Sequence, residues 1–595
     1  MKASYNVTLK LRGPILTRSS SPDAFGVDAP FHRSDDGKSL ILPRTLIQGN
    51  LRASLRELAT VDSKFDLGDL LGRPSEGDAK PSDEAVNPGS FDPRRSRIQI
   101  SDFAHATGNS PQESPKRYRI SIDPDRKAVK PMAYQVIESP FAPGQEVLFT
   151  GRIDIDARGQ EKPEDIAKKL LAGMRFLTSV GAHKTSGFGR LLGADMAAAS
   201  TTQVAAAPTT QATPALPDED ELLLTLTMLD PFCVPQNQPA TNLFQSGVVI
   251  PGNVIKGAIA TMAIADGKGA AFLDKVTIGH AFPAGTAAGG QRARVIPYSL
   301  VKSKDHLQDM RFQEGRTLVN GEAPEFSTDW KNGFTSKVKE AFGWPGLARD
   351  LKVRTAINEK GAAKDGQLFA VESVVPPSDV VWVAHVHCAD TTTRKTLGEV
   401  AGDGTQVTPL SKTRARAIVG WEKRTIDVPS PIQHGGKNYY VITLQTDALL
   451  FPSEALDEST DTGRLGDLYT SAWNDLSGGS MALDHLYFAR QKLAGGRYLH
   501  GRFRSATAYH PLILTEAGSV FALEVKDREK AAEKIKMWLR ENLPLPATVE
   551  AAYLANGEPR FKALPYLPEN GFGEIAVNMA TPDLEKPAQK AEAGQ

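Results

Sequence analysis

Three stretches of this sequence alternate apolar and polar side chains, at residues 5–11, 222–228 and 440–445. Such alternation predicts β-strands with one buried face, because successive side chains of a strand point to opposite sides. After each of the first two stretches comes a short loop region and then a helix that a proline introduces, at Pro43 and Pro251. A chain whose segments open in the same way is expected to contain repeated domains of one type.

The repeat continues beyond these openings. Thr45 and Asn253 are the predicted N-caps of the two proline-led helices, since each offers a side-chain oxygen to the first unpaired amides. Residues 122–138 and 357–372 both indicate a strand, a polar excursion that contains lysine, and a second strand. The first block then has an amphipathic helix, with apolar residues at helical spacing: Ile166, Leu170, Met174 and Leu177.

Each segment closes on a turn rich in glycine or cations, at residues 181–191, 410–417 and 570–577. A helix over residues 528–539 is predicted before the last of these turns. The order strand–helix–strand, strand–helix–strand is that of a ferredoxin-like unit. We therefore predict an α+β protein of tandem ferredoxin-like (RRM-like) domains, with inserted hairpins and glycine-rich loops.

The domain boundaries are predicted from length and composition. A chain of 595 residues is too long for one core. A run of small and polar residues with proline cannot bury enough surface to order itself, which predicts a linker between the blocks and a tail after them. The expected parts are 1–195, a linker over 196–220, a second domain over 221–436, its second ferredoxin-like half over 437–580, and a disordered tail over 581–595.

Net charge does not point to a partner, because Lys+Arg and Asp+Glu both total 70. A nucleic-acid surface needs only a local basic stripe, so this balance leaves RNA binding open. Only two cysteines occur, Cys233 and Cys388, which favours a reducing cytoplasm. No run of about 20 apolar residues is present and the N-terminus lacks the apolar core of a signal peptide, so no membrane association is expected. Nothing resembles a P-loop, a Gly-x-Ser-x-Gly elbow or a dinucleotide fingerprint.

Together these motifs resemble the repeat-associated mysterious protein (RAMP) superfamily, the RNA-binding subunits of CRISPR type III effectors. The proline-led helix start and the glycine-rich loop near a domain's end are its two marks. The first block resembles the backbone subunit of type III complexes along nearly its whole length. The matching pieces are residues 26–31, Pro43, residues 122–123, Glu138 and residues 181–191.

The second block resembles the subunit that caps the 5′ tag of the guide RNA, in the form found in subtype III-D. The matching pieces are residues 250–260, 276–283, 295–300, 412–416, 446–450 and 517–521. The resemblance covers roughly nine tenths of the chain and implies a fusion of the two kinds of subunit. The family's glycine and lysine at the first helix are replaced by Arg44 and Gln48, whereas the second block keeps Gly252 and Lys256.

A subunit that follows an RNA backbone needs cations and exposed amides. In the loop 181–191, Gly187 and Gly189 are predicted to allow close approach of a phosphate, with His183, Lys184 and Arg190 around it. A surface turn is the alternative. The third loop has Glu574 where the first has Arg190, so we do not expect it to touch phosphate. The other predicted RNA-binding residues are Arg44, Arg52, Lys127, Lys130, Met132, Lys256, Lys412, Arg414 and Arg416.

The resemblance assigns the excursion around Lys127, Lys130 and Met132 to the thumb hairpin of backbone subunits, a wedge between guide and target that unstacks a nucleotide. A plain β-hairpin is the alternative there, and a solvated charge run is the alternative at 412–416. Aromatic residues make up 7% of the chain, and no predicted strand carries the paired aromatics of an ordinary RRM. Base stacking is therefore not expected to be the main binding mode.

The resemblance also implies a catalytic acid at Asp28, because in matching backbone subunits the acid between first strand and first helix cleaves the target RNA. A carboxylate can bind Mg²⁺ or another divalent cation, or assist proton transfer, while the 2′-hydroxyl attacks its own phosphate. The expected products carry a 2′,3′-cyclic phosphate and a 5′-hydroxyl. The alternative is that Asp28 caps a turn beside Gly26. Asp35 and Asp36 are neighbouring carboxylates, and the matching loop 234–246 contains no acid.

We therefore predict a type III subunit that binds guide RNA and its 5′ tag and cleaves complementary target RNA. The implied partners are guide RNA, target RNA and other effector subunits: a large polymerase-like subunit, further backbone subunits and a small subunit. A non-catalytic guide-RNA binder is the main alternative. A repeat-RNA-processing endonuclease would need a general base, for which His32 and His183 are candidates. His385 and His387 share one strand face but lack a second ligand pair for zinc.

Overall fold

The computed structural model divides the chain into two compact units, each of which is described by itself. Unit 1 comprises Met1–Thr210, Thr241–Leu243 and Asp350–Glu372, and unit 2 comprises the remainder. The structure describes residues 2–17, 26–34, 39–65, 68–72, 96–106, 115–120, 122–130, 134–157, 160–199, 216–236, 242–286, 291–303, 306–313, 323–357, 363–456, 463–495, 511–554 and 559–584.

Unit 1 is built on one antiparallel sheet with two helices. Its elements in chain order are β1 (Lys2–Arg12), β2 (Ile41–Leu42), α1 (Arg44–Val61), η1 (Ser63–Phe65), η2 (Gly68–Leu71), β3 (Ile98–Ile100), β4 (Phe103–His105), β5 (Lys116–Arg119), β6 (Gln135–Glu138), β7 (Glu146–Asp156), α2 (Pro163–Phe176), η5 (Lys184–Ser186) and β8 (Arg190–Ala198).

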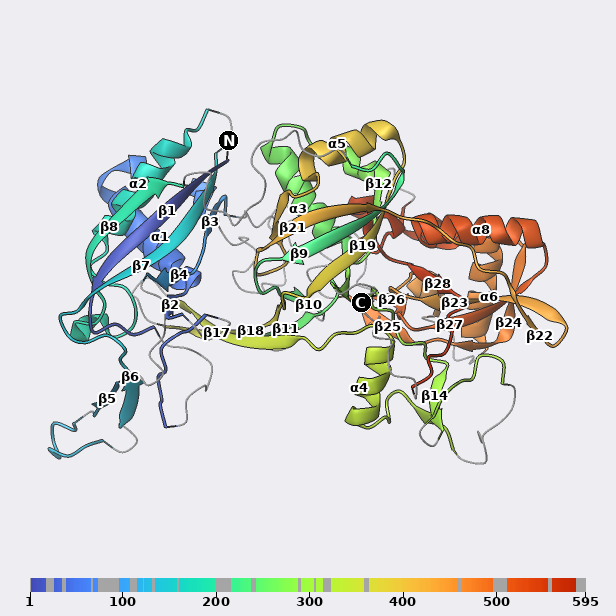
Figure 1. Ribbon diagram of the computed structural model, residues 1–595, viewed down its shortest axis with the longest axis horizontal. Helices are drawn as coiled ribbons and strands as arrows, with labels where there is room; N and C mark the ends of the chain where they lie inside the picture. Colours follow the sequence, from blue (N-terminus) through green and yellow to red (C-terminus); the bar gives the residue numbers. More distant parts are fainter. Residues whose placement is uncertain are drawn as a thin grey trace, which may run out of the picture. The chain divides into compact units, whose positions relative to one another are not determined.

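The sheet of unit 1 has the ferredoxin-like strand order. β1 lies between β8 and β7, and β3 and β4 both pair with β7 on its other side, all antiparallel. The alternating residues of β1, such as Val7 and Leu9, are buried in one core with Leu51 of α1 and Leu170 of α2. Both helices therefore cover the same face of the sheet, and the β5–β6 hairpin extends away from it (Figure 1).

The proline-led helices begin earlier than predicted, so the expected N-caps Thr45 and Asn253 are wrong. Pro43 and Pro251 are themselves the N-caps, without a side-chain cap. The fixed φ of proline suits a helix entry, and the Pro43 carbonyl accepts the first intrahelical bonds. The first amide of α1 is instead satisfied from outside the helix, by Asp102 Oδ1 at 2.5 Å.

Unit 2 begins with a second set of elements. These are β9 (Glu221–Met228), β10 (Val234–Pro235), β11 (Leu243–Gly247), α3 (Gly252–Ala265), η6 (Ala271–Lys275), β12 (Val276–Ile278), β13 (Phe282–Gly285), β14 (Leu300–Ser303), β15 (His306–Asp309), β16 (Glu325–Phe326), α4 (Asn332–Ala341), β17 (Ala348–Ile357), β18 (Ala363–Val375), β19 (Val380–Cys388), α5 (Thr391–Ala401), β20 (Gln406–Leu410) and β21 (Ala415–Lys423), with residues 350–372 of β17 and β18 counted in unit 1.

The remaining elements of unit 2 form a third set. They are β22 (Ile432–His434), β23 (Lys437–Leu444), η7 (Ser453–Leu456), α6 (Arg464–Ser477), β24 (Met481–Phe488), β25 (Gln491–Ala494), β26 (Leu512–Thr515), β27 (Val520–Val525), α8 (Arg528–Glu541), α9 (Ala547–Tyr553), α10 (Arg560–Ala563), η8 (Pro568–Asn570) and β28 (Ile575–Val577).

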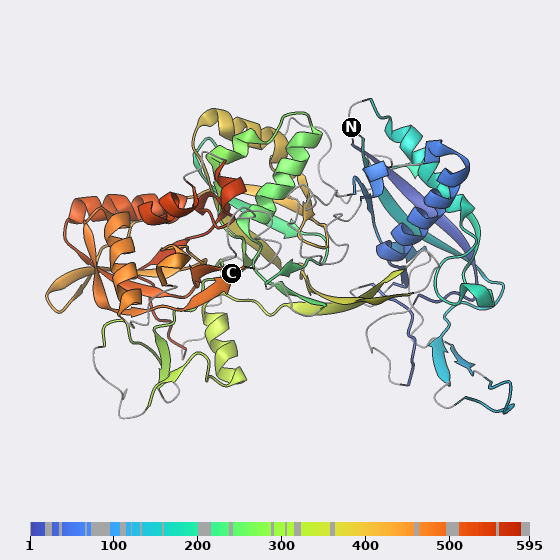
Figure 2. The same ribbon diagram turned by 180° about the vertical axis from the view of Figure 1, so that it is seen from behind.

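Both main sheets of unit 2 repeat the strand order of unit 1. In the first, β9 lies between β21 and β19, and β12 and β13 pair with β19. In the second, β23 lies between β28 and β27, and β24 pairs with β27. Trp473 of α6 and Trp538 of α8 pack together at 5.8 Å between ring centroids, and Figure 2 shows the two helices side by side.

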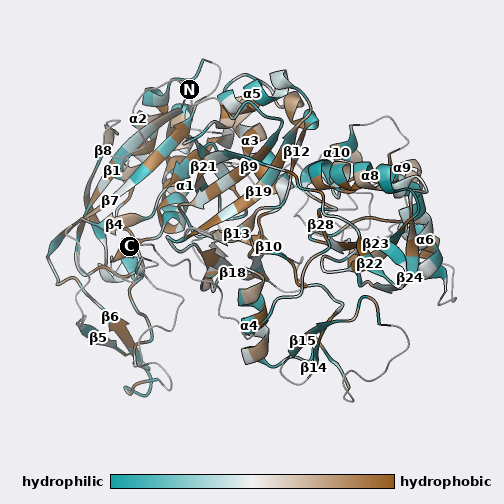
Figure 3. Cartoon of the chain, turned by 45° about the vertical axis from the view of Figure 1, so that its right-hand side comes forward, coloured by the Kyte–Doolittle hydropathy of each residue, from teal (hydrophilic) through white to brown (hydrophobic). Residues whose placement is uncertain are grey.

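The protein is thus α+β, and three of its sheets have the ferredoxin-like order. The side of α8 away from the core is hydrophilic, as Figure 3 shows by colour. Among the described residues, no helix is both long and apolar enough to cross a bilayer. The predicted boundaries at 195, 220, 436 and 580 stay predictions. Most of the expected linker, 200–215, and most of the tail, 585–595, lie outside the described residues.

Candidate nucleic-acid interface

The segment that carries Asp28 lies along β6. The Asp28 amide donates to the Val136 carbonyl at 2.9 Å, and the Val136 amide donates to Asp28 Oδ2 at 2.7 Å. Ala29 forms a parallel bridge with Ile137. Asp28 is exposed, and its other oxygen, Oδ1, has no hydrogen bond or ion pair within the described residues. One oxygen therefore ties the loop to β6 and the other is accessible.

Glu138 fixes this segment from the end of β6. Its buried carboxylate accepts the Phe31 amide at 2.6 Å through Oε2 and forms an ion pair with Arg33 through Oε1. The Phe31 ring packs edge-on against Phe141, with 5.7 Å between centroids. These contacts fix the segment that follows Asp28 against the end of β6.

The β5–β6 hairpin exposes an apolar surface. Tyr118 and Tyr134 are 63% and 58% exposed and stack with 5.9 Å between centroids. Farther out, Ile122 and Val129 form an antiparallel bridge and are both exposed, as is Ile120. A contiguous exposed apolar patch of this kind marks a binding surface. Sequence reasoning missed the tyrosine pair, because its two members lie sixteen positions apart in the chain.

The predicted cations of the hairpin flank this apolar surface. Lys127 and Lys130 are exposed near the turn, where the Asp125 and Arg126 amides donate to Asp123 Oδ1. Neither lysine has an ion pair within the described residues. The predicted tip residue Met132 lies outside the described residues.

The glycine loop of unit 1 is a 3₁₀ turn between α2 and β8. His183 and Gly187, at its two ends, both have positive φ, at 57° and 82°. A Cβ on Gly187 would meet nothing within 4 Å, whereas a Cβ on Gly189 would lie 1.9 Å from the Val180 carbonyl oxygen. The amide of Gly189 is also taken by the Pro14 carbonyl at 2.7 Å. Gly187 thus faces open space, and Gly189 serves internal packing.

Lys184 points from this loop to α1. Its Nζ donates to Asn50 Oδ1 at 2.6 Å, which is a neutral acceptor. Burial lowers the pKa of Lys184 because desolvation disfavours the charged ammonium. The lysine therefore lacks a counter-charge within the described residues.

The root of the hairpin adds two cations that sequence reasoning missed. Arg117 lies over the Phe188 ring at 5.9 Å, and Arg119 Nη1 lies 2.6 Å from His183 Nδ1. The signal was present as three cations in four residues, Lys-Arg-Tyr-Arg at 116–119. Within the described residues, none of the cations around this loop forms an ion pair: Lys116, Arg117, Arg119, Lys184 and Arg190. In a chain of balanced charge, this is a local excess of positive charge.

Other predicted residues of unit 1 have internal contacts. The Arg52 guanidinium donates to the carbonyls of Leu71 and Gly72, and burial followed by repulsion from Arg56 lowers its pKa. Arg44 is half-buried at the start of α1. His32, a candidate base for RNA processing, is buried.

The predicted cations of unit 2 have contacts within that unit. Lys256 is buried on α3, and burial lowers its pKa to about 8 against the opposing charges of Glu569 and Asp274. Lys412 Nζ lies 3.8 Å from the centroid of the Phe244 ring. Arg414 has a positive φ of 59°. The Arg416 guanidinium makes a bidentate pair with Asp230 at 2.8 and 2.9 Å.

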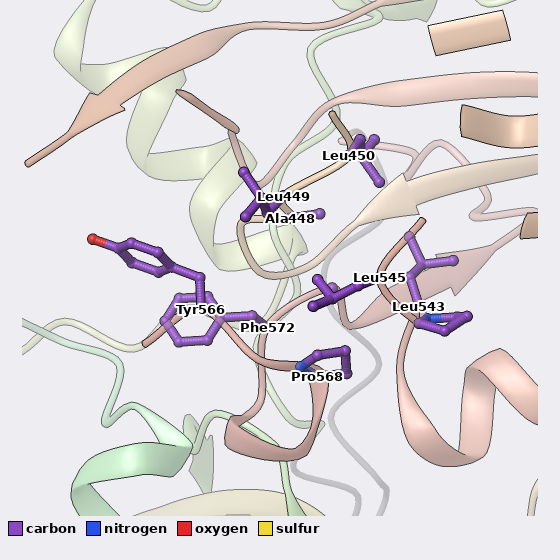
Figure 4. A pocket seen from close by; sticks show the side chains of 10 residues that line it. Ala448, Leu449, Leu450, Leu543, Leu545, Tyr566, Pro568 and Phe572 are labelled. Atoms are coloured by element: carbon purple, nitrogen blue, oxygen red, sulfur yellow. The ribbon is translucent and has the colours of Figure 1, made fainter. Parts of the chain in front are cut away.

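The third glycine loop, Gly571–Gly573, is enclosed by other residues of unit 2. Glu574 accepts two hydrogen bonds from Arg292, at 2.6 and 3.0 Å. Burial would raise the pKa of Glu574, but Arg292, then His385 and Arg424, outweigh it and hold the value at about 2. Beside the loop lies a small apolar pocket, where the Phe572 ring meets Tyr566 at 5.1 Å (Figure 4). The residues of this loop therefore pack within unit 2.

The two histidines of the predicted pair each lie near a carboxylate of unit 2. His385 Nδ1 lies 3.6 Å from Glu574, and His387 Nδ1 lies 2.7 Å from Glu221. No group of three histidine, cysteine, aspartate or glutamate side chains suited to a metal ion occurs in the part of the chain that the structure describes. Both histidines therefore face carboxylates inside unit 2.

Comparisons with known proteins give little beyond this geometry. No family model matches the chain, and no curated protein matches it. Among solved structures, a chain of the Type III-B Cmr-beta complex bound to cognate target RNA and AMPPnP is 13% identical with a TM-score of 0.29. The match covers 51% of this chain and 86% of that one. A chain of Cmr-beta bound to cognate target RNA is 14% identical with a TM-score of 0.28, over 50% and 86%. Scores this low carry no argument about function.

Proposed function

We propose that this chain is an RNA-binding subunit of a type III CRISPR ribonucleoprotein, and that unit 1 holds guide RNA and cleaves the paired target RNA through Asp28. The observation that carries the proposal is the group of cations without ion pairs around the glycine loop, beside Gly187. A polyanion supplies many counter-charges at once, so it is the ligand that such a surface favours. The motif order that resembles RAMP subunits narrows this polyanion to guide RNA.

The hairpin supports a second part of the proposal. Its exposed tyrosine pair and isoleucines would contact unstacked bases at little cost in free energy. Its lysines would contact the adjoining phosphates. A wedge at this place separates a nucleotide from its neighbours. A displaced nucleotide can place its 2′-hydroxyl in line with the scissile phosphorus, which the stacked A-form helix prevents.

In this proposal Asp28, whose segment lies along β6 of the hairpin, acts on the strained nucleotide. The 2′-oxygen attacks phosphorus and the 5′-oxygen leaves, which gives a 2′,3′-cyclic phosphate and a 5′-hydroxyl. Oδ2 is held by Val136, so Oδ1 is the atom that accepts the hydroxyl proton. The leaving oxygen takes its proton from solvent.

A divalent cation also fits this carboxylate, since Mg²⁺ in nucleic-acid sites is often held by one or two carboxylates together with substrate phosphates. Asp28 would then hold it through Oδ1, and the ion would neutralise charge on the phosphate. Cleavage assays with Mg²⁺ and with a chelator distinguish this role from proton transfer by Asp28 alone.

One observation favours a second candidate, a guide-RNA binder without cleavage. Asp28 already has a structural task, because Oδ2 tethers the loop to β6. Asp28→Asn keeps an oxygen for the Val136 amide but removes the charge, and Asp28→Ala removes both.

The test uses the chain with its co-purifying subunits, loaded with a defined guide and given labelled complementary RNA. If Asp28 is catalytic, Asp28→Asn lowers the cleavage rate by about a hundredfold or more and leaves guide binding unchanged. Cleavage by Asp28→Asn at the wild-type rate would refute the catalytic role. The matched control is Asp165→Asn, an exposed carboxylate at the start of α2.

A further inference from the structure

The two faces of β5 have different surroundings. Its side chains alternate, so Arg117 and Arg119 lie on one face and Tyr118 on the other. Both arginines contact the glycine loop, whereas Tyr118 is exposed beside Tyr134. One strand therefore carries the apolar surface of the hairpin on one side and touches the candidate phosphate loop with the other.

Arg119 makes the closer of these contacts. Its Nη1 lies 2.6 Å from His183 Nδ1, and its Nη2 donates to Ser186 Oγ at 3.3 Å. A guanidinium can only donate, so His183 Nδ1 must accept. The ring proton then lies on Nε2 and the imidazole is neutral. Arg119 thus spans the 3₁₀ turn from its N-cap, His183, to its last residue, Ser186.

His183 is the residue at which the loop changes direction. Its φ of 57° is unfavourable for a residue with a side chain, so the conformation needs support from its surroundings. The contact with Arg119 provides such support from the hairpin. Lys184, the next residue, depends on the same turn to reach Asn50.

The opposite strand of the hairpin root holds Asp28. Tyr118, the neighbour of Arg119, is the register partner of Val136, whose amide binds Asp28 Oδ2. The glycine loop and the Asp28 loop are therefore attached to adjacent positions of one two-stranded ladder. A shift of this ladder would therefore move both the glycine loop and the Asp28 loop.

We propose that Arg119 is a positioning residue that fastens the glycine loop to the root of the hairpin, so that Lys184 and Asp28 keep one geometry when the hairpin engages RNA. The consequence for RNA rests on the proposed function. The fastening itself does not, and it can be measured on the free protein.

Arg119→Lys separates positioning from charge. Lysine keeps the cation, but one ammonium on a flexible stem does not reproduce the planar, two-point contact with His183 and Ser186. Arg119→Gln removes the charge as well. Arg175→Lys is the matched control, because Arg175 at the end of α2 also donates to two acceptors, the Ala194 carbonyl and Asp195.

The first measurements need no RNA. Hydrogen exchange at the Ser186 and Gly187 amides is expected to be at least tenfold faster in both Arg119 variants and unchanged in Arg175→Lys. Nitrogen NMR of labelled histidine, assigned with His183→Gln, is expected to show the Nε2–H form in wild type and a mixture of tautomers in both variants. Wild-type exchange and tautomer in Arg119→Lys would overturn the proposal.

The second measurement follows RNA affinity against salt concentration. Arg119→Lys is expected to weaken binding of a guide RNA about tenfold without changing the salt dependence, because the number of cations is the same. Arg119→Gln is expected to weaken it further and to lower the slope. Wild-type affinity in Arg119→Lys would mean that Arg119 acts only as a charge. If wild-type protein bound no RNA, the proposed function would fail, and the exchange and tautomer data would still decide the fastening.

Discussion

Two glycine loops of this protein have similar backbone conformations, but one is exposed and the other is enclosed. Ser186–Arg190 in unit 1 and Asn570–Glu574 in unit 2 both start at the last residue of a 3₁₀ turn and lead into the last strand of a ferredoxin-like sheet. Gly187 and Gly571 have φ values of 82° and 94°, and the later glycines have 61° and 76°. In each loop the second glycine amide donates to a carbonyl that follows the first strand of the sheet.

The difference lies in what faces each loop. A Cβ on Gly187 would meet open space, whereas a Cβ on Gly571 would lie 2.4 Å from His280 Nδ1. The residue after the second glycine is an exposed Arg190 in unit 1 and a buried Glu574 in unit 2. The same type of turn is thus exposed in unit 1 and enclosed in unit 2, and it is followed by a residue of opposite charge in the two places. The first loop is exposed, and the third joins two sheets of unit 2.

The largest effect is expected from Glu574→Ala, which would leave the half-buried Arg292 without the buried carboxylate that balances its charge. Removal of one partner from a buried pair costs about 3–5 kcal/mol. The free energy of unfolding from a denaturant titration should fall by that amount, without a change in RNA affinity. Glu574→Leu combined with Arg292→Met is the control, since removal of both charges should recover part of the loss. A change below about 1 kcal/mol in Glu574→Ala would mean that the pair does not join the sheets.

Acid is expected to lower the free energy of unfolding through groups around Glu574. Burial lowers the pKa of His280 to about 4 and of His385 to about 3, from 6.5. Folding keeps both rings neutral, so the unfolded chain gains protons first and stability falls as pH drops below 6.5. Glu574, held at about 2 from a starting value of 4.5, adds a loss as pH falls from 4.5 toward 2.

Denaturant midpoints between pH 7 and pH 3 test this expectation. They should fall steadily across that range, and His385→Phe should flatten the part between pH 6.5 and about 3. His434→Gln, at an exposed histidine, is the control and should leave the profile unchanged. A wild-type midpoint that stays constant from pH 6.5 to pH 4 would contradict the role of the buried histidines.

Much of the fold could be predicted from the sequence, because the alternation in 5–11 and the spacing in 166–174 reflect local periodicity. The charge exchange between Arg190 and Glu574 was visible in the chain, but the burial of Glu574 depends on Arg292, which lies 282 positions away in the sequence. The helix starts were misjudged because a proline carbonyl at Pro43 can accept the first helical bonds without a side-chain cap.

The contacts of the candidate site were harder to foresee. Arg119 meets His183 across 64 positions, and Val136 meets Asp28 across 108. Such pairs arise only when strands from distant parts of the chain are placed in register, and no local pattern encodes them. Likewise, nothing in the sequence distinguishes Gly187, which faces open space, from Gly189, which packs against Val180.

The glycines themselves offer the next test. Gly571→Ala would place a methyl group against His280 and the Gly279 backbone in addition to its unfavourable φ, so we expect a loss of about 2–4 kcal/mol in stability. Gly187→Ala has only the φ penalty, about 1 kcal/mol, but its methyl group would obstruct a phosphate. RNA affinity should therefore fall in Gly187→Ala and not in Gly571→Ala. Equal stability losses in the two variants would contradict the difference in surroundings.

The smallest effect concerns Lys184. Its bond to Asn50 leaves its charge unbalanced, and burial has already lowered its pKa. Lys184→Gln should weaken binding of a guide RNA about tenfold and lower the slope of log affinity against log salt by about 1. Lys168→Gln, an exposed lysine of α2, is the control.

A bound phosphate would also raise the pKa of Lys184, because it adds the opposite charge that the lysine lacks. RNA binding at alkaline pH should therefore take up a proton, which calorimetry in buffers of different ionisation enthalpy detects. Lys184→Arg should bind RNA without that uptake, since arginine is charged throughout. If proton uptake persisted in Lys184→Arg, another group would be the one that takes up the proton. The first loop would then differ from the third only in its exposure, and not in having a lysine whose charge a phosphate balances.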